Sequence, residues 1–361
     1  MSILIKRTDT TSGGVSSKGY PPGNVSNVSI SGGSNVVLIR FSDPDDTIEG
    51  ATILSAWQST ILVRKKGSAP TSIKDGDIVL TNTIRNKYKD SYFTDTNVEF
   101  GNYYYRFFIC STDKVYNDST NMIYSTNVAE LDPILKNNTW DQINVAAETG
   151  NIPSTWNIGD EIDLTLSGEF NETITLQIWD FNHFDKSDGS GKAGICFGSK
   201  DVMNGTQKMN TWDTNSGGWN ATYMKNTVMQ NIFKSMPSNL QNYIKEVNTY
   251  ANKGNNGTDV SSSPGLLSTD KVFLPGNNEV CNTYWSQSTT EKNQTQFPIF
   301  TDDSSRKKTM HNEDNVIYSW WTRSPYYYDT TYCFCYIDSS GTYYNYKIAS
   351  ADLWICFCFC I

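Results

Sequence analysis

The chain has 361 residues, with 37% hydrophobic, 13% aromatic and 19% charged side chains and a formal net charge of −9. This length predicts about two or three domains, each able to bury its own core. We expect no nucleic-acid partner, because such a surface needs clustered lysines and arginines and no basic run is longer than three residues, as in Arg306-Lys307-Lys308. We also expect no membrane insertion and no signal peptide, because the sequence has neither an apolar run of about 18 residues nor an apolar segment of about 7–15 residues at its start.

The N-terminal third divides into an arm and a strand-rich segment. Residues 1–23 are rich in Ser, Thr, Gly and Pro, so we expect an attachment arm or a disordered one. Residues 24–130 contain short strand patterns separated by turns, such as V-V-L-I-R-F-S-D-P (36–44). About seven such strands in roughly 100 residues predict an all-β sandwich of the immunoglobulin or fibronectin III-like class. The run G-N-Y-Y-Y-R-F-F (101–108) resembles the penultimate strand of fibronectin type III domains, which implies a spacer role.

The next segment combines a helix with a hairpin. N-N-T-W-D-Q-I-N-V-A-A-E-T-G (137–150) predicts a helix capped by Asn138 or Thr139 and closed by Gly150. Apolar and polar residues then alternate over 161–181, which predicts a β-hairpin.

Further helices are expected downstream. Residues 217–237 show helical spacing of apolar side chains, and a second helix is expected to start at a capping box formed by Ser238 and Gln241. K-V-F-L-P-G (271–276) predicts a short buried strand. Helices beside an antiparallel sheet with long loops predict an α+β domain over 131–361.

The chain contains only poor matches to known catalytic and metal-binding motifs. Asp180, His183 and Asp185 fall close together, but the segment departs from the calcium-loop pattern, so a polar loop at a strand end fits them better. His311 has acidic neighbours but no accompanying Ser or Cys nucleophile motif. No phosphate-binding glycine loop or dinucleotide fingerprint is present. We therefore expect no catalytic site, no metal and no cofactor.

Eight cysteines are present, and five of them lie in the last 30 residues with a spacing of two. On a strand, Cys356, Cys358 and Cys360 would share one face. A zinc site would favour pairs spaced C-x2–4-C on a turn with further ligands nearby. We expect buried, reduced thiols, while the spacing leaves disulfides open.

The aromatic side chains concentrate near the C-terminus, where nine of the 21 tyrosines fall between Tyr318 and Tyr346. Tyrosine offers a large contact area at low rotamer entropy, and interspersed Ser, Asn and Asp offer adaptable hydrogen bonds, as in antibody paratopes. An aromatic-rich antiparallel sheet would have a similar composition, because Tyr and Thr favour strands. Composition alone favours neither the binding surface nor the aromatic-rich sheet.

A family resemblance favours the binding interpretation. W-W-T-R-S-P (320–325), the Tyr/Asn/Asp/Ser-rich ribbon that follows and the terminal F-C-I resemble the variable proteins of diversity-generating retroelements. In that family, template adenines are scrambled so that Asn codons become Tyr, Asp, Ser, Thr, His, Ala, Phe or Leu, and the residues after Pro325 are largely drawn from this set. The resemblance implies a C-type-lectin-like fold for 131–361 and a hypervariable ribbon over 326–354. The chain departs from many relatives, which carry a G-[VI]-x-P step near the end.

Within this module, Trp320 and Trp321 are expected to be core anchors, and Arg323 is expected to tie a loop through its fork of donors. The tyrosines of the ribbon are expected to be mostly exposed on one face. The ligand-binding residues that the resemblance implies are Tyr326, Tyr327, Tyr328, Asp329, Tyr332, Phe334, Tyr336, Asp338, Tyr343, Tyr344, Asn345, Tyr346, Asp352, Leu353 and Trp354.

The resemblance implies a phage or prophage tail receptor-binding protein, made in the bacterial host cytoplasm and carried in the virion. Its partners would be a host cell-surface protein or glycan, other tail proteins contacting residues 1–23, and copies of itself, as a trimer. One alternative is an enzyme related to formylglycine-generating proteins, which would need a reactive pair at Cys333/Cys335 or Cys356/Cys358. A second is a bacterial surface adhesin, which would need an export signal.

Overall fold

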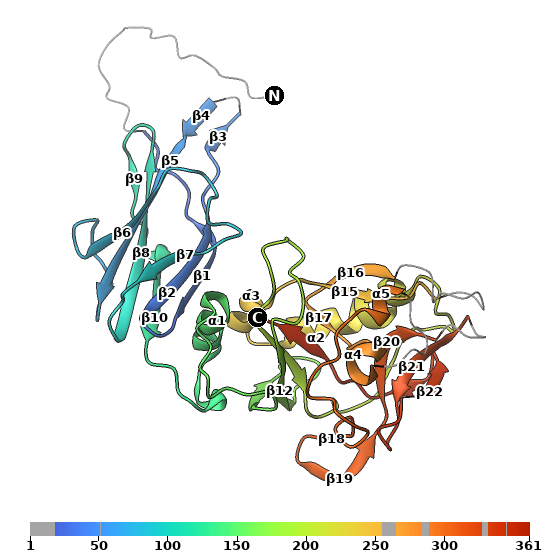
Figure 1. The fold of residues 1–361 in the computed structure, drawn as a ribbon. Helices are drawn as coiled ribbons and strands as arrows, with labels where there is room; N and C mark the ends of the chain where they lie inside the picture. Colours follow the sequence, from blue (N-terminus) through green and yellow to red (C-terminus); the bar gives the residue numbers. More distant parts are fainter. Residues whose placement is uncertain (1–18, 51, 255–264, 283–288, 327–330, 344) are drawn as a thin grey trace, which may run out of the picture. The chain divides into compact units, whose positions relative to one another are not determined.

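The structure is a computed structural model, and strands outweigh helices in it (Figure 1). The chain divides into two compact units, one comprising the described residues up to Ile30 and Leu38–Val128, the other Ser31–Val37 and Ala129–Ile361. Within the described ranges, no helix has the length and apolarity needed to span a membrane. The residues that the structure describes are 19–50, 52–254, 265–282, 289–326, 331–343 and 345–361.

The first unit is all-β. It combines a three-stranded sheet of order β1-β2-β7 with a five-stranded sheet of order β10-β8-β5-β6, in which β9 also pairs with β8. Phe41 of β2 meets Phe107 of β8 with ring centroids 4.9 Å apart, so the two sheets pack face to face. The predicted all-β sandwich is confirmed. The strand bounds are β1 Ser26–Gly32, β2 Val36–Ser42, β3 Thr47–Glu49, β4 Thr52–Ser55, β5 Trp57–Lys66, β6 Asp77–Asn82, β7 Phe93–Thr96, β8 Gly101–Ser111, β9 Tyr116–Asn117 and β10 Ile123–Val128.

The second unit is built on a five-stranded sheet of order β11-β12-β13-β24-β17. The predicted hairpin over 161–181 is confirmed as its first two strands, which pair antiparallel. The last strand of the chain, β24, lies between β13 and β17, so it is an interior strand of the sheet and not an edge strand. The strand bounds are β11 Glu161–Thr165, β12 Thr173–Phe181, β13 Ile195–Ser199, β17 Val272–Phe273 and β24 Cys358–Cys360.

The helix predicted over 137–150 is confirmed as α1 (Trp140–Thr149). Thr139 is its N-cap, and the Thr139 and Gln142 side chains form a capping box. Gly150 ends the helix at a φ of 69°, a conformation that glycine adopts at little cost.

The helical pattern predicted over 217–237 is present but not uniform. A 3-10 turn (Gly218–Ala221) comes first, and a π-helical turn (Met224–Val228) then leads into α2 (Met229–Ser235). The π turn adds one residue per turn within an otherwise α-helical run, which apolar spacing alone cannot reveal.

The predicted start of the next helix is wrong in one detail. Helix α3 (Ser238–Tyr243) has Pro237 at its N-cap, so Ser238 lies inside the helix and no side chain caps it. The amide of Gln241 instead donates to the carbonyl oxygen of Met236 at 2.8 Å. Proline occupies the cap position, and the expected capping box therefore cannot form.

The rest of the second unit consists of short helices, two-stranded ribbons and one three-stranded sheet of order β20-β21-β22. The ribbons pair β14 with β23, β15 with β16 and β18 with β19. The bounds are β14 Gln207–Lys208, β15 Val247–Ala251, β16 Leu266–Asp270, α4 Asn277–Cys281, α5 Thr289–Lys292, β18 Lys308–Met310, β19 Glu313–Tyr318, β20 Trp320–Pro325, β21 Cys333–Ile337, β22 Asn345–Ile348 and β23 Asp352–Leu353.

Candidate functional site

The W-W-T-R-S-P strand, β20, forms the base of the candidate site, and all six of its residues are buried. Trp320 and Trp321 have no exposed surface. Their indole nitrogens donate to the carbonyl oxygens of Arg306 at 3.0 Å and Gln207 at 2.9 Å. The prediction that both tryptophans are core anchors is confirmed, since their bulk is buried and their one polar atom is paired.

Arg323 joins β20 to two other segments from within the core. Its guanidinium binds both carboxylate oxygens of Glu279, with Nη1 at 2.7 Å from Oε2, and neither side chain is exposed. The same group donates to the carbonyl oxygens of Leu274 at 3.0 Å and Tyr250 at 3.1 Å. The predicted tie is therefore confirmed, and it fixes the strand from which the ribbon departs.

The ribbon itself presents only part of its predicted surface. Tyr332 and Tyr346 are 42% and 44% exposed, and Asp352 is exposed as well. Four of the implied residues, Tyr327, Tyr328, Asp329 and Tyr344, lie outside the described residues, as does the side chain of Asn345.

Three implied ligand contacts are corrected by the structure. Phe334 (0% exposed) and Leu353 (3%) point into the core, and Tyr326 (5%) is covered. Phe334 alternates with its strand neighbours along β21, so it faces the opposite side from them. The ring of Tyr326 lies flat against Tyr346, with centroids 3.9 Å apart and planes 10° apart. These side chains support the surface rather than form it.

The remaining implied residues are half-buried, and each has an intramolecular neighbour. The ring of Tyr336 lies 6.4 Å from Trp321, that of Trp354 lies 4.5 Å from Tyr318, and Tyr343 lies under the Arg306 guanidinium at 5.3 Å. Asp338 accepts hydrogen bonds from the backbone nitrogens of Ser340 and Thr342, both at 2.9 Å, and so closes its own turn. Each of these four half-buried residues therefore has only part of its surface free to contact a ligand.

A second segment, which is not among the residues predicted from the sequence, belongs to the candidate site. The loop of residues 209–216 carries Trp212, which is 76% exposed, more than any other large hydrophobic side chain of the described residues. Its neighbours are Asn, Thr, Asp and Ser, with no apolar periodicity. A tryptophan in such a polar stretch, with no apolar periodicity to place it on a core face, was the available signal.

Hydrogen bonds hold this loop against the ribbon. The backbone nitrogens of Asn210 and Asn215 donate to the carbonyl oxygens of Ala349 at 2.9 Å and Thr331 at 2.8 Å. The Asn215 side chain is buried and donates to the carbonyl oxygens of Tyr326 at 2.8 Å and Cys333 at 3.1 Å. Strand β14, just before the loop, pairs with β23 of the ribbon. The loop and the ribbon therefore form one surface, on which Trp212 is the most exposed aromatic residue.

All eight cysteines are buried and unbridged, as expected for structural thiols. Burial raises the pKa of Cys356, and it raises the pKa of Cys358 well above its ordinary value. Their sulfur atoms lie 3.2 Å from the carbonyl oxygen of Ser199 and 3.4 Å from that of Phe273. Such thiols stay protonated and are poor nucleophiles.

Neither histidine forms part of an obvious catalytic group. His183 stacks on Phe297 with centroids 4.1 Å apart, and its Nδ1 lies 2.7 Å from Asp180. His311 lies in the turn between β18 and β19, and its Nδ1 lies 3.1 Å from the Thr175 hydroxyl and 3.2 Å from the Asp201 carboxylate. Over the ranges that the structure describes, no three His, Cys, Asp or Glu side chains are grouped in a way that could hold a metal ion.

Comparisons with known proteins found one family model and one solved structure that are similar to parts of this chain. A family model described as a domain of unknown function (DUF6273) matches residues 195–361, a stretch that includes the 209–216 loop and the ribbon. The solution structure of the third fibronectin III domain of the human KIAA0343 protein is similar at 15% sequence identity and a TM-score of 0.22, over 35% of this chain and 96% of that chain. No protein with a curated description matches. The sandwich assignment of the first unit rests on its own strand order.

Proposed function

We propose that the chain is a receptor-binding protein of a phage or prophage tail, and that the ribbon 326–354 and the loop 209–216 bind a host cell-surface protein or glycan. In this proposal the second unit is a C-type-lectin-like module of the kind diversified by retroelements, and the first unit is a fibronectin III-like spacer. The activity is binding, without turnover. The sequence resemblance at W-W-T-R-S-P and F-C-I supports the family, and the exposed aromatics support the activity.

The observation that carries the proposal is the group of exposed aromatic side chains at the loop and the ribbon. Trp212 is 76% exposed, Tyr346 44%, Tyr332 42% and Tyr223 40%. The backbone nitrogen of Tyr223 donates to the Asn210 side chain at 2.9 Å, which places this tyrosine beside the loop. Tryptophan and tyrosine supply much of the binding energy of protein interfaces, and exposed apolar groups of this kind mark interaction sites.

The enzyme alternative is not favoured by the cysteine environments. A formylglycine-generating type of reaction would need a reactive thiol pair in a cleft. Cys333, Cys335, Cys356 and Cys358 are all buried, and burial raises the pKa of the last two. A rigid aromatic surface is better suited to recognising a ligand than to thiol chemistry.

Assembly belongs to the same proposal. Residues 1–23 would contact other tail proteins, and several copies of the chain, as a trimer, would add avidity to weak individual contacts. A bacterial surface adhesin would use the same aromatic surface, but it would be found on the producing cell. Immunogold labelling of purified particles and of producing cells distinguishes the two locations.

The binding surface is tested by removing its exposed aromatics. The triple variant Trp212→Ala/Tyr332→Ala/Tyr346→Ala should lose adsorption of the labelled protein to host cells, because such truncations cost on the order of 2 kcal/mol or more each, or roughly 30-fold in affinity. Its melting temperature should change little, since exposed positions contribute little to stability. The matched control is Ile84→Ala/Phe100→Ala, which removes side chains that are 62% and 48% exposed in the first unit. Adsorption of the triple variant at the level of the parent would contradict the proposal.

A further inference from the structure

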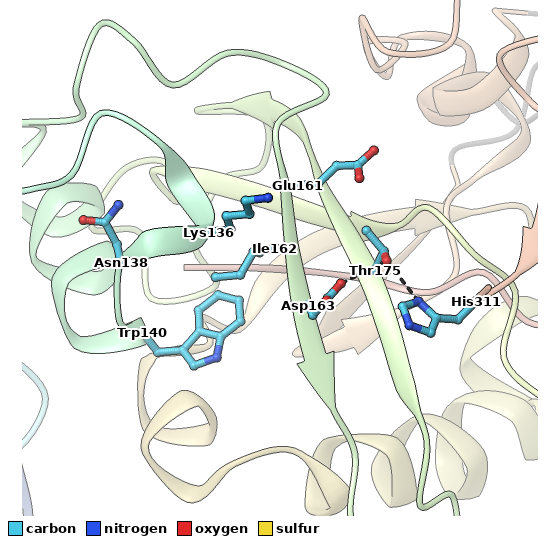
Figure 2. A pocket seen from close by; sticks show the side chains of 8 residues that line it. All are labelled: Lys136, Asn138, Trp140, Glu161, Ile162, Asp163, Thr175 and His311. Carbon is cyan, nitrogen blue, oxygen red and sulfur yellow. Dashed lines mark hydrogen bonds between the residues drawn. The ribbon is translucent and has the colours of Figure 1, made fainter.

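A groove runs along β11, which is the edge strand of the five-stranded sheet. It consists of two adjoining cavities of about 570 and 300 Å³, both lined by Lys136 and Glu161. Figure 2 shows the side chains of the larger cavity gathered around this strand. None of the lining residues belongs to the ribbon 326–354 or to the loop 209–216. We call it the β11 groove.

One wall of the groove is held rigid by the segment that precedes α1. The Asn138 side chain accepts from the backbone nitrogen of Asp132 at 2.9 Å and donates to three carbonyl oxygens between residues 132 and 135. Trp140 follows as the first residue of α1, and its half-buried ring packs edge-to-face on Phe197 with centroids 5.6 Å apart. The groove therefore has a fixed aromatic side chain in its lining.

Around the edge of β11, on the other face of the sheet from Trp140, the lining is a chain of polar groups. A carboxylate only accepts hydrogen bonds, so the Thr175 hydroxyl donates to Asp163 Oδ1 at 3.0 Å. His311 Nδ1 lies 3.1 Å from the same hydroxyl and 3.2 Å from the buried carboxylate of Asp201. Nδ1 therefore carries the proton, and in the neutral imidazole Nε2 is left as an acceptor. Two of these links are drawn in Figure 2.

Several polar atoms of the lining are not used within the protein. In the part of the chain that the structure describes, Lys136 Nζ, Asp163 Oδ2, His311 Nε2 and the Trp140 indole nitrogen have no hydrogen-bond or ion-pair partner. Two of these groups are donors and two are acceptors. The net charge is small, because the lining carries Lys136 and the carboxylates of Asp160, Glu161 and Asp163, and Lys200 pairs with Glu161 at 2.9 Å.

We propose that the β11 groove binds a neutral oligosaccharide. Sugar hydroxyls both donate and accept hydrogen bonds, so they match the mixed set of Lys136, Asp163 and His311 atoms, and the C–H face of a pyranose ring packs on an aromatic ring such as that of Trp140. The balanced charge gives no preference to an anionic ligand. The elongated shape, continued by the second cavity towards Pro133 and Ile134, fits more than one sugar unit. This site is separate from the aromatic surface and does not depend on it.

The test uses the full chain on an array of neutral glycans, followed by calorimetry with the best ligand and with sialyllactose as an anionic comparator. The variant Lys136→Ala/Asp163→Asn changes two exposed side chains and should weaken binding at least about tenfold. The matched control Lys234→Ala/Glu169→Gln changes exposed residues elsewhere in the same unit and should bind like the parent. Trp212→Ala should also bind the glycan like the parent.

Four results would overturn the proposal. These are failure of the parent to bind any neutral glycan on the array, tighter binding of sialyllactose, undiminished binding by the groove variant, and equal loss in the control variant. If Trp212→Ala abolished glycan binding while the groove variant did not, the glycan would belong to the aromatic surface. That outcome would support the proposed function and reject the groove.

Discussion

Arg323 and Glu279 are both fully buried, so each depends on the other for neutralisation. Removing one partner should leave an uncompensated buried charge and cost about 3–5 kcal/mol. We therefore expect Arg323→Met and Glu279→Gln each to lower the free energy of unfolding strongly. The double variant should be less destabilised than the sum of the two. Urea unfolding of the four proteins measures this coupling, and strictly additive losses would contradict it.

The half-buried carboxyl group of Glu172 makes the free energy of unfolding depend on pH. Burial raises the pKa of Glu172 above its ordinary value of 4.5, its Oε1 is buried without a partner, and its Oε2 accepts from the Asn204 backbone at 2.8 Å. Because the pKa in the folded state lies above that in the unfolded state, the folded state binds the proton more tightly. Stability is therefore lost as pH rises through the raised pKa.

Glu172→Gln removes the carboxylate, and with it the free-energy cost of burying the negative charge. The variant should be more stable than the parent at pH 7 by about 0.5 kcal/mol or more, and the difference should vanish below the unfolded value of 4.5. Urea unfolding at pH 4 and pH 7 measures it, with Glu169→Gln as an exposed control that should show no such trend. A Glu172→Gln protein less stable than the parent at pH 7 would show that the charge is favourable.

At the scale of elements, strands β12 and β13 depend on a glycine. The register between them shifts around Trp179, and this buried indole lies over Gly198, where an added Cβ would come within 2.0 Å of the ring. Gly198→Ala should therefore force the tryptophan or the strand to move and cost about 1–3 kcal/mol. Thermal melting measures the loss, and adding Trp179→Phe should recover part of it. An unchanged melting temperature would mean that the strand pair shifts without strain.

The elements differ in how well local sequence predicts them. Helix α1 was predictable because Thr139, Gln142 and Gly150 make its caps within the segment itself. The start of α3 was not, since Pro237 displaces the expected cap, and the π turn at Met224–Val228 has no local signature. Caps and periodicity involve a few neighbouring residues, and the effect of Pro237 is local too, whereas an altered helical turn depends on the packing around it.

At the scale of the whole molecule, the C-terminal strand shows how far pairing extends along the chain. Strand β24 pairs Cys360 with Cys196 and Cys358 with Phe273, so residues from three separate regions form one sheet. The two compact units divide near Val128, where the strand pattern of the sandwich ends. The composition of the sequence predicts an all-β segment followed by an α+β segment, but not the order of the strands in the second sheet.

For the candidate site, the sequence by itself predicted that Trp320 and Trp321 are core anchors, that Arg323 ties a loop and that aromatic residues concentrate after them. Residue type is enough for this prediction. Tryptophan rings are usually buried in cores, and an arginine guanidinium usually binds several acceptors at once. Only the tertiary structure decided that Tyr326, Phe334 and Leu353 are covered and that Trp212 lies beside the ribbon. Exposure depends on which distant segments pack against a side chain, and the hydrogen bonds that bring residues 209–216 to residues 331–350 join positions more than a hundred residues apart.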